Sequence, residues 1–277
     1  MQIGTNSIAQ TAVHALYSAN AAAATASQRI STGFRINQAS DDPVGMALGN
    51  KLKVQISSML KAIDNVSQGV AMTQIVDTSL SEMVDVLGKM RETAVAAESS
   101  TASTTDRTGY QDAMDAYVDE IDSIASNAVW NGNSLMASDQ TVNIQAGANS
   151  DETIGISFVQ TQVSTLFTSL TNGSLDVSSA SAAADTVDYI DTALDTINAY
   201  QSYMGSMATV MSTHSDALTG VSTAYSSAYG NIMNADLAQE TANLAAAQIQ
   251  QSGATAMLSQ ANNMNKELVT YLLKSVA

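Results

Sequence analysis

The sequence predicts an all-α fold, a long antiparallel coiled-coil or helix bundle that contains one small β-hairpin region. Two observations support this prediction. Apolar residues recur three and four positions apart through most of the 277 residues, which is the spacing of a coiled-coil seam. Only 5% of the residues are aromatic although 45% are hydrophobic, and this composition is typical of long helices packed side by side rather than of a compact α/β core.

The seams place the helices along the chain. Apolar residues follow the seam spacing in five segments, which are predicted helices at 9–30, 52–94, 110–128, 187–232 and 237–272. The first and last seams consist mainly of alanine, which lets helices approach closely but buries little area per residue. We therefore expect each terminal helix to be marginal alone and to need a partner, either the other terminus or other copies of the chain.

A short segment between the first two helices contains the only proline, Pro43. Gly33 suits the left-handed position that follows the C-terminus of a helix. Asp42 followed by Pro43 suits an N-cap and a first helical residue, because the missing N–H of proline is not needed there. Residues 34–37 between them are too polar and irregular for a helix. The segment therefore predicts a fixed joint between two helices.

The helical pattern stops between the third and fourth helices. Residues 131–134, Asn-Gly-Asn-Ser, predict a turn. Residues 141–145 and 153–158 alternate apolar and polar side chains on either side of a loop, which predicts a β-hairpin at about 141–158. The stretch 161–184 is rich in Ser, Thr and Ala without a clear period, and we expect it to form an exposed tip.

The charge of the chain excludes some functions. The formal net charge is −16, and no Lys or Arg occurs between Thr108 and Asn265. Nucleic-acid binding needs a basic surface, and anionic membranes repel an acidic one, so we expect no nucleic acid as a partner and no membrane insertion. The absence of cysteine excludes disulfides and thiolate chemistry.

The sequence offers little for catalysis. It contains no phosphate-binding or dinucleotide-binding glycine motif, and His14 and His214 are isolated from other metal ligands. Aspartates recur on one face of two predicted helices, at 112–122 and 185–195, where they could bind Ca²⁺ between helices or form a solvated face. We favour the solvated face, and we expect no enzymatic activity, no cofactor and no metal.

Several motifs together resemble those of bacterial flagellin, and the likeness covers almost the whole chain. The motif of the joint is highly specific. The matching segments are QRISTGFRIN at 28–37, DDPVG at 41–45, MRETAV at 90–95, NG at 131–132, QAGAN at 145–149, ADLA at 235–238 and SQAN at 259–262.

The resemblance implies a structural subunit that self-assembles into the extracellular filament of the bacterial flagellum for swimming motility. It implies that residues 1–45 and 235–277 pair as the two halves of an inner, terminal coiled-coil domain, and that 46–234 form a helical rod domain. It also implies a homopolymer. The further partners would be the flagellar export apparatus, a flagellin chaperone, and hook-associated and cap proteins.

The resemblance, together with the joint and the seams described above, assigns roles to individual residues. The joint and self-assembly residues are Arg29, Ile30, Gly33, Arg35, Asn37, Asp41, Asp42 and Pro43, and the terminal coiled-coil residues are Leu16, Ile30, Leu244, Leu258, Leu268 and Leu272. Lys89, Arg91 and Glu92 stand where the family has a toll-like receptor epitope, although Thr93 replaces a leucine that is common there. We favour ion pairs of Arg29 and Arg35 with Asp41, Asp42 or a neighbouring subunit.

Two alternatives to a filament subunit stay open at this point. The hook–filament junction protein of the flagellum shares the same helical ends, but the motifs at 131–132 and 145–149 favour flagellin. A surface-displayed flagellin-like binding protein belongs to a different class, and ligand binding by cells that lack filaments would identify it.

Overall fold

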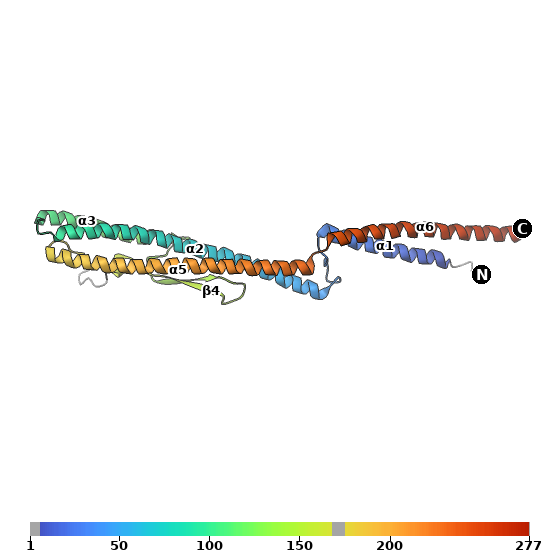
Figure 1. Ribbon diagram of the computed structural model, residues 1–277, viewed down its shortest axis with the longest axis horizontal. Coiled ribbons are helices and arrows are strands. Elements are labelled where there is room, and N and C mark those ends of the chain that lie inside the picture. The colour runs from blue at the N-terminus through green and yellow to red at the C-terminus, as the bar shows by residue number, and fades with distance from the viewer. Residues whose placement is uncertain (1–5, 168–174, 277) are drawn as a thin grey trace. The chain divides into compact units, whose positions relative to one another are not determined.

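The structure is a computed structural model that describes residues 6–167 and 175–276 (Figure 1). Its elements are α1 (Ser7–Thr32), α2 (Pro43–Glu98), α3 (Thr104–Asn127), β1 (Val129–Trp130), β2 (Asn133–Ser134), β3 (Gln140–Gln145), β4 (Thr153–Phe158), α4 (Val163–Leu166), α5 (Ala180–Met233) and α6 (Leu237–Val276). Long helices dominate and the strands are short, so the predicted all-α fold with a small hairpin region is confirmed.

The chain divides into two compact units. The terminal unit consists of residues 1–54 and 224–277, and the central unit of residues 55–223. The boundaries fall inside α2 and α5 rather than at a helix end. Within the terminal unit the start of α2 packs closely against the end of α5, because a Cβ added to Gly49 would lie 2.6 Å from the sulfur of Met233.

Helices α2, α3 and α5 run side by side (Figure 1). Their apolar seams form most of the core of the central unit. Large side chains at seam spacing are fully buried in it, among them Leu80, Met83, Leu87 and Met90 of α2, Met114 and Ile121 of α3, and Ile190, Ile197 and Met204 of α5. Burial of each such side chain stabilises the folded unit by about 1.5–3 kcal/mol. The central unit therefore has a hydrophobic core of its own.

Strands β3 and β4 form the predicted hairpin, with Gln140 opposite Phe158 in an antiparallel register. Ile144, Ile156 and Phe158 are buried in the core of the central unit. Gly69 of α2 permits this close approach, because a Cβ there would lie 3.2 Å from Ile144. The position of the hairpin at 141–158 is confirmed.

Two tyrosines of α5 bind the backbone of β4 and of the residue after it. The hydroxyl of Tyr203 accepts a hydrogen bond from the N–H of Ser157 at 3.2 Å, and that of Tyr200 accepts one from the N–H of Val159 at 3.0 Å. Burial raises the pKa of Tyr200 to about 12. Free donors on an edge strand attract other strands, so these hydroxyls protect the hairpin from edge-to-edge pairing.

The turn predicted at 131–134 is confirmed as the connection between β1 and β2, where Trp130 pairs with Asn133. Asn131 has a φ of 50° and Gly132 a φ of 83°. Both central residues are therefore left-handed, as a type I′ turn requires, and Asn-Gly is the preferred sequence for that turn.

The predicted exposed tip at 161–184 is wrong for its described residues. Val163, Phe167 and Leu175 are buried in the core of the central unit. The remaining part of the predicted tip, 168–174, lies outside the described residues. The segment contains apolar residues whose spacing is too irregular to produce a period, so composition alone indicated exposure.

Candidate assembly site: the joint and the terminal helix pair

Gly33 ends α1 and begins the joint. Its φ is 75°, in the left-handed region, and its N–H donates to the carbonyl of Arg29 at 2.8 Å. Among the described residues other than its chain neighbours, no heavy atom lies within 4 Å of the position that a Cβ would take. The backbone conformation, and not a lack of space, therefore favours glycine here. The predicted left-handed cap is confirmed.

Asp42 caps the start of α2. Its Oδ1 accepts the N–H of Val44 at 3.1 Å and that of Gly45 at 2.9 Å. Pro43 is the first residue of the helix, where its fixed φ is favourable and its missing N–H costs nothing. The predicted N-cap and first helical residue are confirmed.

Asp41 holds the loop between α1 and α2 in one conformation. Its Oδ2 accepts the N–H of Asn37 at 3.0 Å and that of Gln38 at 3.1 Å. These backbone donors, Asn37 first, lower the pKa of the Asp41 carboxyl. Asn37 in turn donates from Nδ2 to the carbonyl of Phe34 at 2.8 Å. The polar residues of the loop are thus used to fix its own backbone.

The connector between α5 and α6 pairs with this loop. The N–H of Arg35 donates to the carbonyl of Met233 at 2.7 Å, and the N–H of Ala235 donates to the carbonyl of Gly33 at 2.9 Å, in a short antiparallel bridge. Arg35 Nη2 also donates to the carbonyl of Ile232 at 2.8 Å. Arg35 therefore caps the C-terminal end of α5, where carbonyls lack helical partners. No local pattern in the sequence signals this pairing, so it was not predicted.

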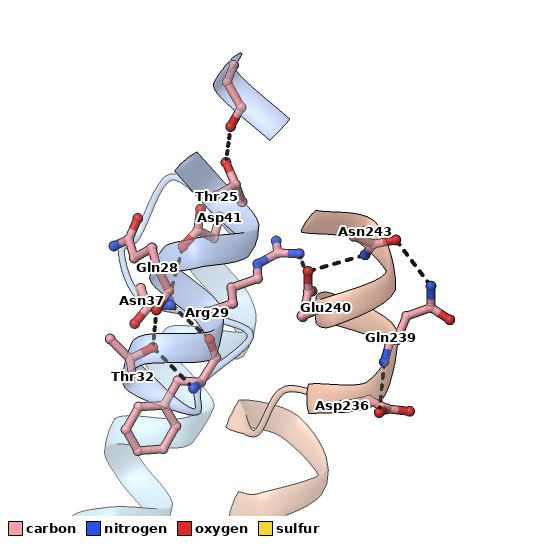
Figure 2. A network of polar contacts seen from close by, with 12 residues as sticks. Thr25, Gln28, Arg29, Thr32, Asn37, Asp41, Asp236, Gln239, Glu240 and Asn243 are labelled. Carbon is pink, nitrogen blue, oxygen red and sulfur yellow. Dashed lines mark hydrogen bonds and ion pairs between the residues drawn. The ribbon is translucent and has the colours of Figure 1, made fainter. Parts of the chain in front are cut away.

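An ion pair next to the joint connects α1 with α6 (Figure 2). Arg29 Nη1 lies 2.9 Å from Glu240 Oε1, and Asn243 Nδ2 donates to Glu240 Oε2 at 3.2 Å. Glu240 is only 7% exposed. The amide of Asn243 and then the guanidinium of Arg29 hold the pKa of the Glu240 carboxyl below its ordinary range.

The ion pairs predicted within the joint are wrong. Asp41 and Asp42 accept backbone N–H groups, while Arg29 pairs with Glu240 and Arg35 binds backbone carbonyls of α5. Arg29 and Glu240 are 211 positions apart in the sequence, so their contact depends on how the two ends of the chain pair. Pairing of these arginines with a neighbouring subunit stays a prediction.

Helices α1 and α6 pack antiparallel along a seam of alanines (Figure 1). Asn6 Nδ2, just before the start of α1, donates to the carbonyl of Ala261, in the second half of α6, at 3.0 Å. The apolar residues that the seam buries are Ala12, Ala19 and Ala26 of α1, and Ala247, Ala254 and Ala261 of α6. Both series repeat every seven residues, as in a coiled coil. The predicted pairing of the two termini is confirmed.

The larger apolar residues of this helix pair are incompletely covered. Leu16, Ile30, Leu244 and Leu258 are half-buried, and the side chains of Leu268 and Leu272 lie outside the described residues. Others are largely exposed: Tyr17 at 71%, Ile249 at 73%, Met257 at 57% and Tyr271 at 75%. Two helices cannot enclose side chains on all of these faces. The terminal unit therefore presents apolar surface that is available to a partner.

The residues of the predicted receptor epitope lie on an exposed part of α2. Lys89, Arg91 and Glu92 are all exposed. Arg91 is engaged within the chain, because its Nε and Nη2 donate to the carboxylate of Asp191 on α5 at 2.6 and 3.2 Å. That bidentate contact lowers the pKa of Asp191.

The described residues contain neither a cluster of metal ligands nor a helix that could span a membrane. Across 6–167 and 175–276, no group of three or more His, Asp or Glu is placed to bind a metal ion. None of the helices in this part of the chain combines the length and the hydrophobicity that crossing a bilayer requires. His214 binds the carbonyl of Ala146 through Nε2 at 2.7 Å, and His14 is exposed.

Comparison with family models identifies both ends of the chain. Residues 3–141 match the N-terminal helical region of bacterial flagellin, and residues 187–272 match its C-terminal helical region. A flagellin of Halalkalibacterium halodurans is 29% identical over 248 residues, which cover 89% of this chain and 90% of the relative. A flagellin of Salmonella typhimurium is 33% identical over 192 residues, which cover 69% of this chain and 39% of that longer relative.

Two solved structures share the fold. Bacillus cereus flagellin aligns with a TM-score of 0.50 and 24% identity, over 56% of this chain and 88% of the other. A putative flagellar hook-associated protein of Vibrio parahaemolyticus aligns with a TM-score of 0.59 and 12% identity, over 70% of this chain and all of the other. At these identities the likeness concerns the fold alone.

Proposed function

The chain belongs to the bacterial flagellin family and is a subunit of the flagellar filament, and we propose that its terminal unit is the surface through which copies polymerise. The family is structural and its members form the extracellular filament. We propose accordingly that the chain is not an enzyme, and that it reaches the filament through the flagellar export apparatus with a chaperone and contacts hook-associated and cap proteins there.

The observation that supports the assembly role is the incomplete core of the terminal unit. The apolar residues that α1 and α6 bury fully are alanines, whereas large side chains such as Tyr17 and Ile249 are 71% and 73% exposed. Alanine contributes little buried area, and side chains of that size gain about 1.5–3 kcal/mol each when a partner covers them. Polymerisation would cover them with the same surface from neighbouring copies.

A hook-associated role is the weaker reading. The hook-associated protein of Vibrio parahaemolyticus is similar in fold, at 12% identity. Both family models that match here describe flagellin, and the Halalkalibacterium flagellin aligns over 90% of its own length. These findings favour a filament subunit over a junction protein.

Electron microscopy of the purified protein after a polymerisation trial tests the proposal. We expect filaments from the wild-type chain and few or none from Ile249→Asn, which removes an exposed apolar side chain of α6. The matched control is Val210→Asn on α5 of the central unit, where the original side chain is 51% exposed. Filaments of normal length from Ile249→Asn would argue that the assembly surface lies elsewhere.

A further inference from the structure

The alanine seam between α1 and α6 does not by itself define how the two helices align. The buried alanines recur every seven residues in both helices, at 12, 19 and 26 and at 247, 254 and 261. A slide of one helix by seven residues, roughly 10 Å at the rise of an α-helix, therefore brings alanine onto alanine again. A regular pattern of small residues specifies its register weakly, as in other coiled coils without a polar marker.

Glu240 interrupts this regularity. It lies seven residues before Ala247, in the same buried series of α6. Among the buried residues that the structure describes, it is the one that carries a charge. Its carboxylate is held between Arg29 of α1 and Asn243 of its own helix (Figure 2). A buried carboxylate is costly unless a cation or hydrogen-bond donors satisfy it.

A register shift by one heptad separates this pair. In one direction Glu240 moves beside Ala22, which offers no positive charge. In the other direction Arg29 moves beside Ala247, and Glu240 passes the end of α1. The contact of Asn6 with the carbonyl of Ala261 distinguishes the observed register from a shifted one less well, because every residue of α6 carries a carbonyl that Asn6 could bind instead. The slide would also break the backbone bonds of the joint, from Ala235 to Gly33 and from Arg35 to Met233, so the joint opposes it as well. Within the helix pair itself, the ion pair is the contact that only one side chain of the opposite helix can make.

We propose that the ion pair between Arg29 and Glu240 sets the register of the alanine seam together with the backbone bonds of the joint, so that without the ion pair a fraction of chains breaks the joint and pairs α1 and α6 one heptad out of place. A single buried polar contact that fixes alignment is the best attested use of such groups in coiled coils. The inference concerns pairing within one chain, and it rests on the proposed function only in that the measurement is made on polymerised protein.

The absence of cysteine from the chain allows a direct measurement of register. Asn6→Cys combined with Ala261→Cys reports the observed register, because the side chain of Asn6 contacts Ala261. Asn6→Cys combined with Ala254→Cys reports the register shifted by one heptad. Both pairs carry the same change at the N-cap of α1. After polymerisation and mild oxidation, a denaturing gel separates cross-links within a chain from those between chains.

In the otherwise wild-type chain we expect the 6–261 cross-link within a chain to exceed the 6–254 cross-link by about tenfold, which corresponds to about 1.4 kcal/mol. Glu240→Gln, which keeps the shape but removes the charge, should lower that ratio severalfold. Arg29→Glu combined with Glu240→Arg should restore it. Glu267→Gln, at an exposed position of α6, is the matched control and should leave it unchanged.

If the Glu240→Gln chain does not polymerise alone, a small fraction of it is assembled with an excess of cysteine-free wild-type chain, and the same ratio is measured. An unchanged ratio in Glu240→Gln would overturn the proposal even though filaments form. Failure of the wild-type chain to polymerise under any condition would instead contradict the proposed function, so the two failures are distinguishable.

Discussion

The N–H of Ala235 donates to the carbonyl of Gly33 at 2.9 Å, so the connector that leads into α6 is hydrogen-bonded to the residue that ends α1. Gly33 takes part in this contact with a φ of 75°. A β-branched residue tolerates that region poorly, and a shift of its backbone would move the carbonyl away from Ala235.

The first prediction concerns this glycine. Gly33→Val should impair polymerisation severely. Valine is strained in the left-handed conformation, and a backbone shift that relieved the strain would break the hydrogen bond from Ala235. Pro43→Ala should be mild, since Asp42 still caps α2. Critical concentrations for polymerisation and the swimming of cells that carry each variant measure the two effects. Equal behaviour of the two variants would mean that the conformation of Gly33 does not matter to assembly.

The second prediction concerns the packing of the hairpin on α2. A Cβ at Gly69 would lie 2.8 Å from the sulfur of Met211 and 3.2 Å from Ile144. Gly69→Ala should therefore destabilise the central unit by about 1 kcal/mol through overpacking. The matched control is Gly88→Ala on the same helix. No described atom lies within 4 Å of a Cβ placed there. The higher helix propensity of alanine should therefore stabilise the central unit by up to about 1 kcal/mol. Thermal unfolding measures the change in stability that each variant causes. Changes of the same sign in Gly69→Ala and Gly88→Ala would contradict the packing argument.

The third prediction concerns salt. The terminal unit contains five acidic and six basic residues and the central unit 21 acidic and four basic residues, which gives net charges of +1 and −17. Repulsion between central units of neighbouring copies should oppose polymerisation. Salt shortens the screening length from about 30 Å at 0.01 M to about 8 Å at 0.15 M, so the critical concentration should fall as NaCl rises.

A double variant tests the source of this repulsion. Asp188 and Asp195 are exposed on α5, whereas Asp191 between them pairs with Arg91. Asp188→Asn with Asp195→Asn should therefore weaken the salt dependence without breaking an ion pair of the subunit. Sedimentation of polymer across a NaCl series measures it. A critical concentration that rises with salt would mean that attractive ion pairs between subunits outweigh the repulsion.

The fourth prediction concerns pH. The pKa of Glu240 lies below its ordinary value of 4.5 because Asn243 and Arg29 bind the charged form. The contribution of this carboxylate to the paired state is therefore fully present above about pH 4.5 and is lost as the pH falls through the lowered pKa. The difference in critical concentration between the wild-type chain and Glu240→Gln should be largest near pH 6–7 and should shrink on acidification. A difference that is independent of pH would show that the charge of Glu240 contributes nothing.

Local signals in the sequence were sufficient to predict much of this structure. The recurrence of apolar residues three and four positions apart predicted a helix with an alanine seam at 9–30, where Ala12, Ala19 and Ala26 are now found buried, and the chemistry of Gly33 and Asp42 predicted both helix ends at the joint. These features depend on residues within one or two helical turns of each other, where propensity and capping determine the conformation.

Contacts between distant segments were not predictable in the same way. Arg29 had two aspartates nearby in the sequence, but these were already satisfied by backbone N–H groups, and its partner is 211 positions away. The seam position of Glu240 was not predictable from the apolar pattern, because a carboxylate does not belong to such a pattern. The burial of Phe167 and Leu175 likewise depends on the three-dimensional core and not on periodicity.

Hydrogen exchange on the dilute monomer and on the polymer tests the central claim, that the terminal helices are completed by assembly. We expect the amides of residues 244–258 in α6 to exchange fast in the monomer and slowly in the polymer, because the residues that this stretch buries within its own chain are two alanines, Ala247 and Ala254. The amides of residues 76–97 in α2, which surround the core of the central unit, should be protected in both states. Strong protection of 244–258 in the monomer, equal to that in the polymer, would contradict the account.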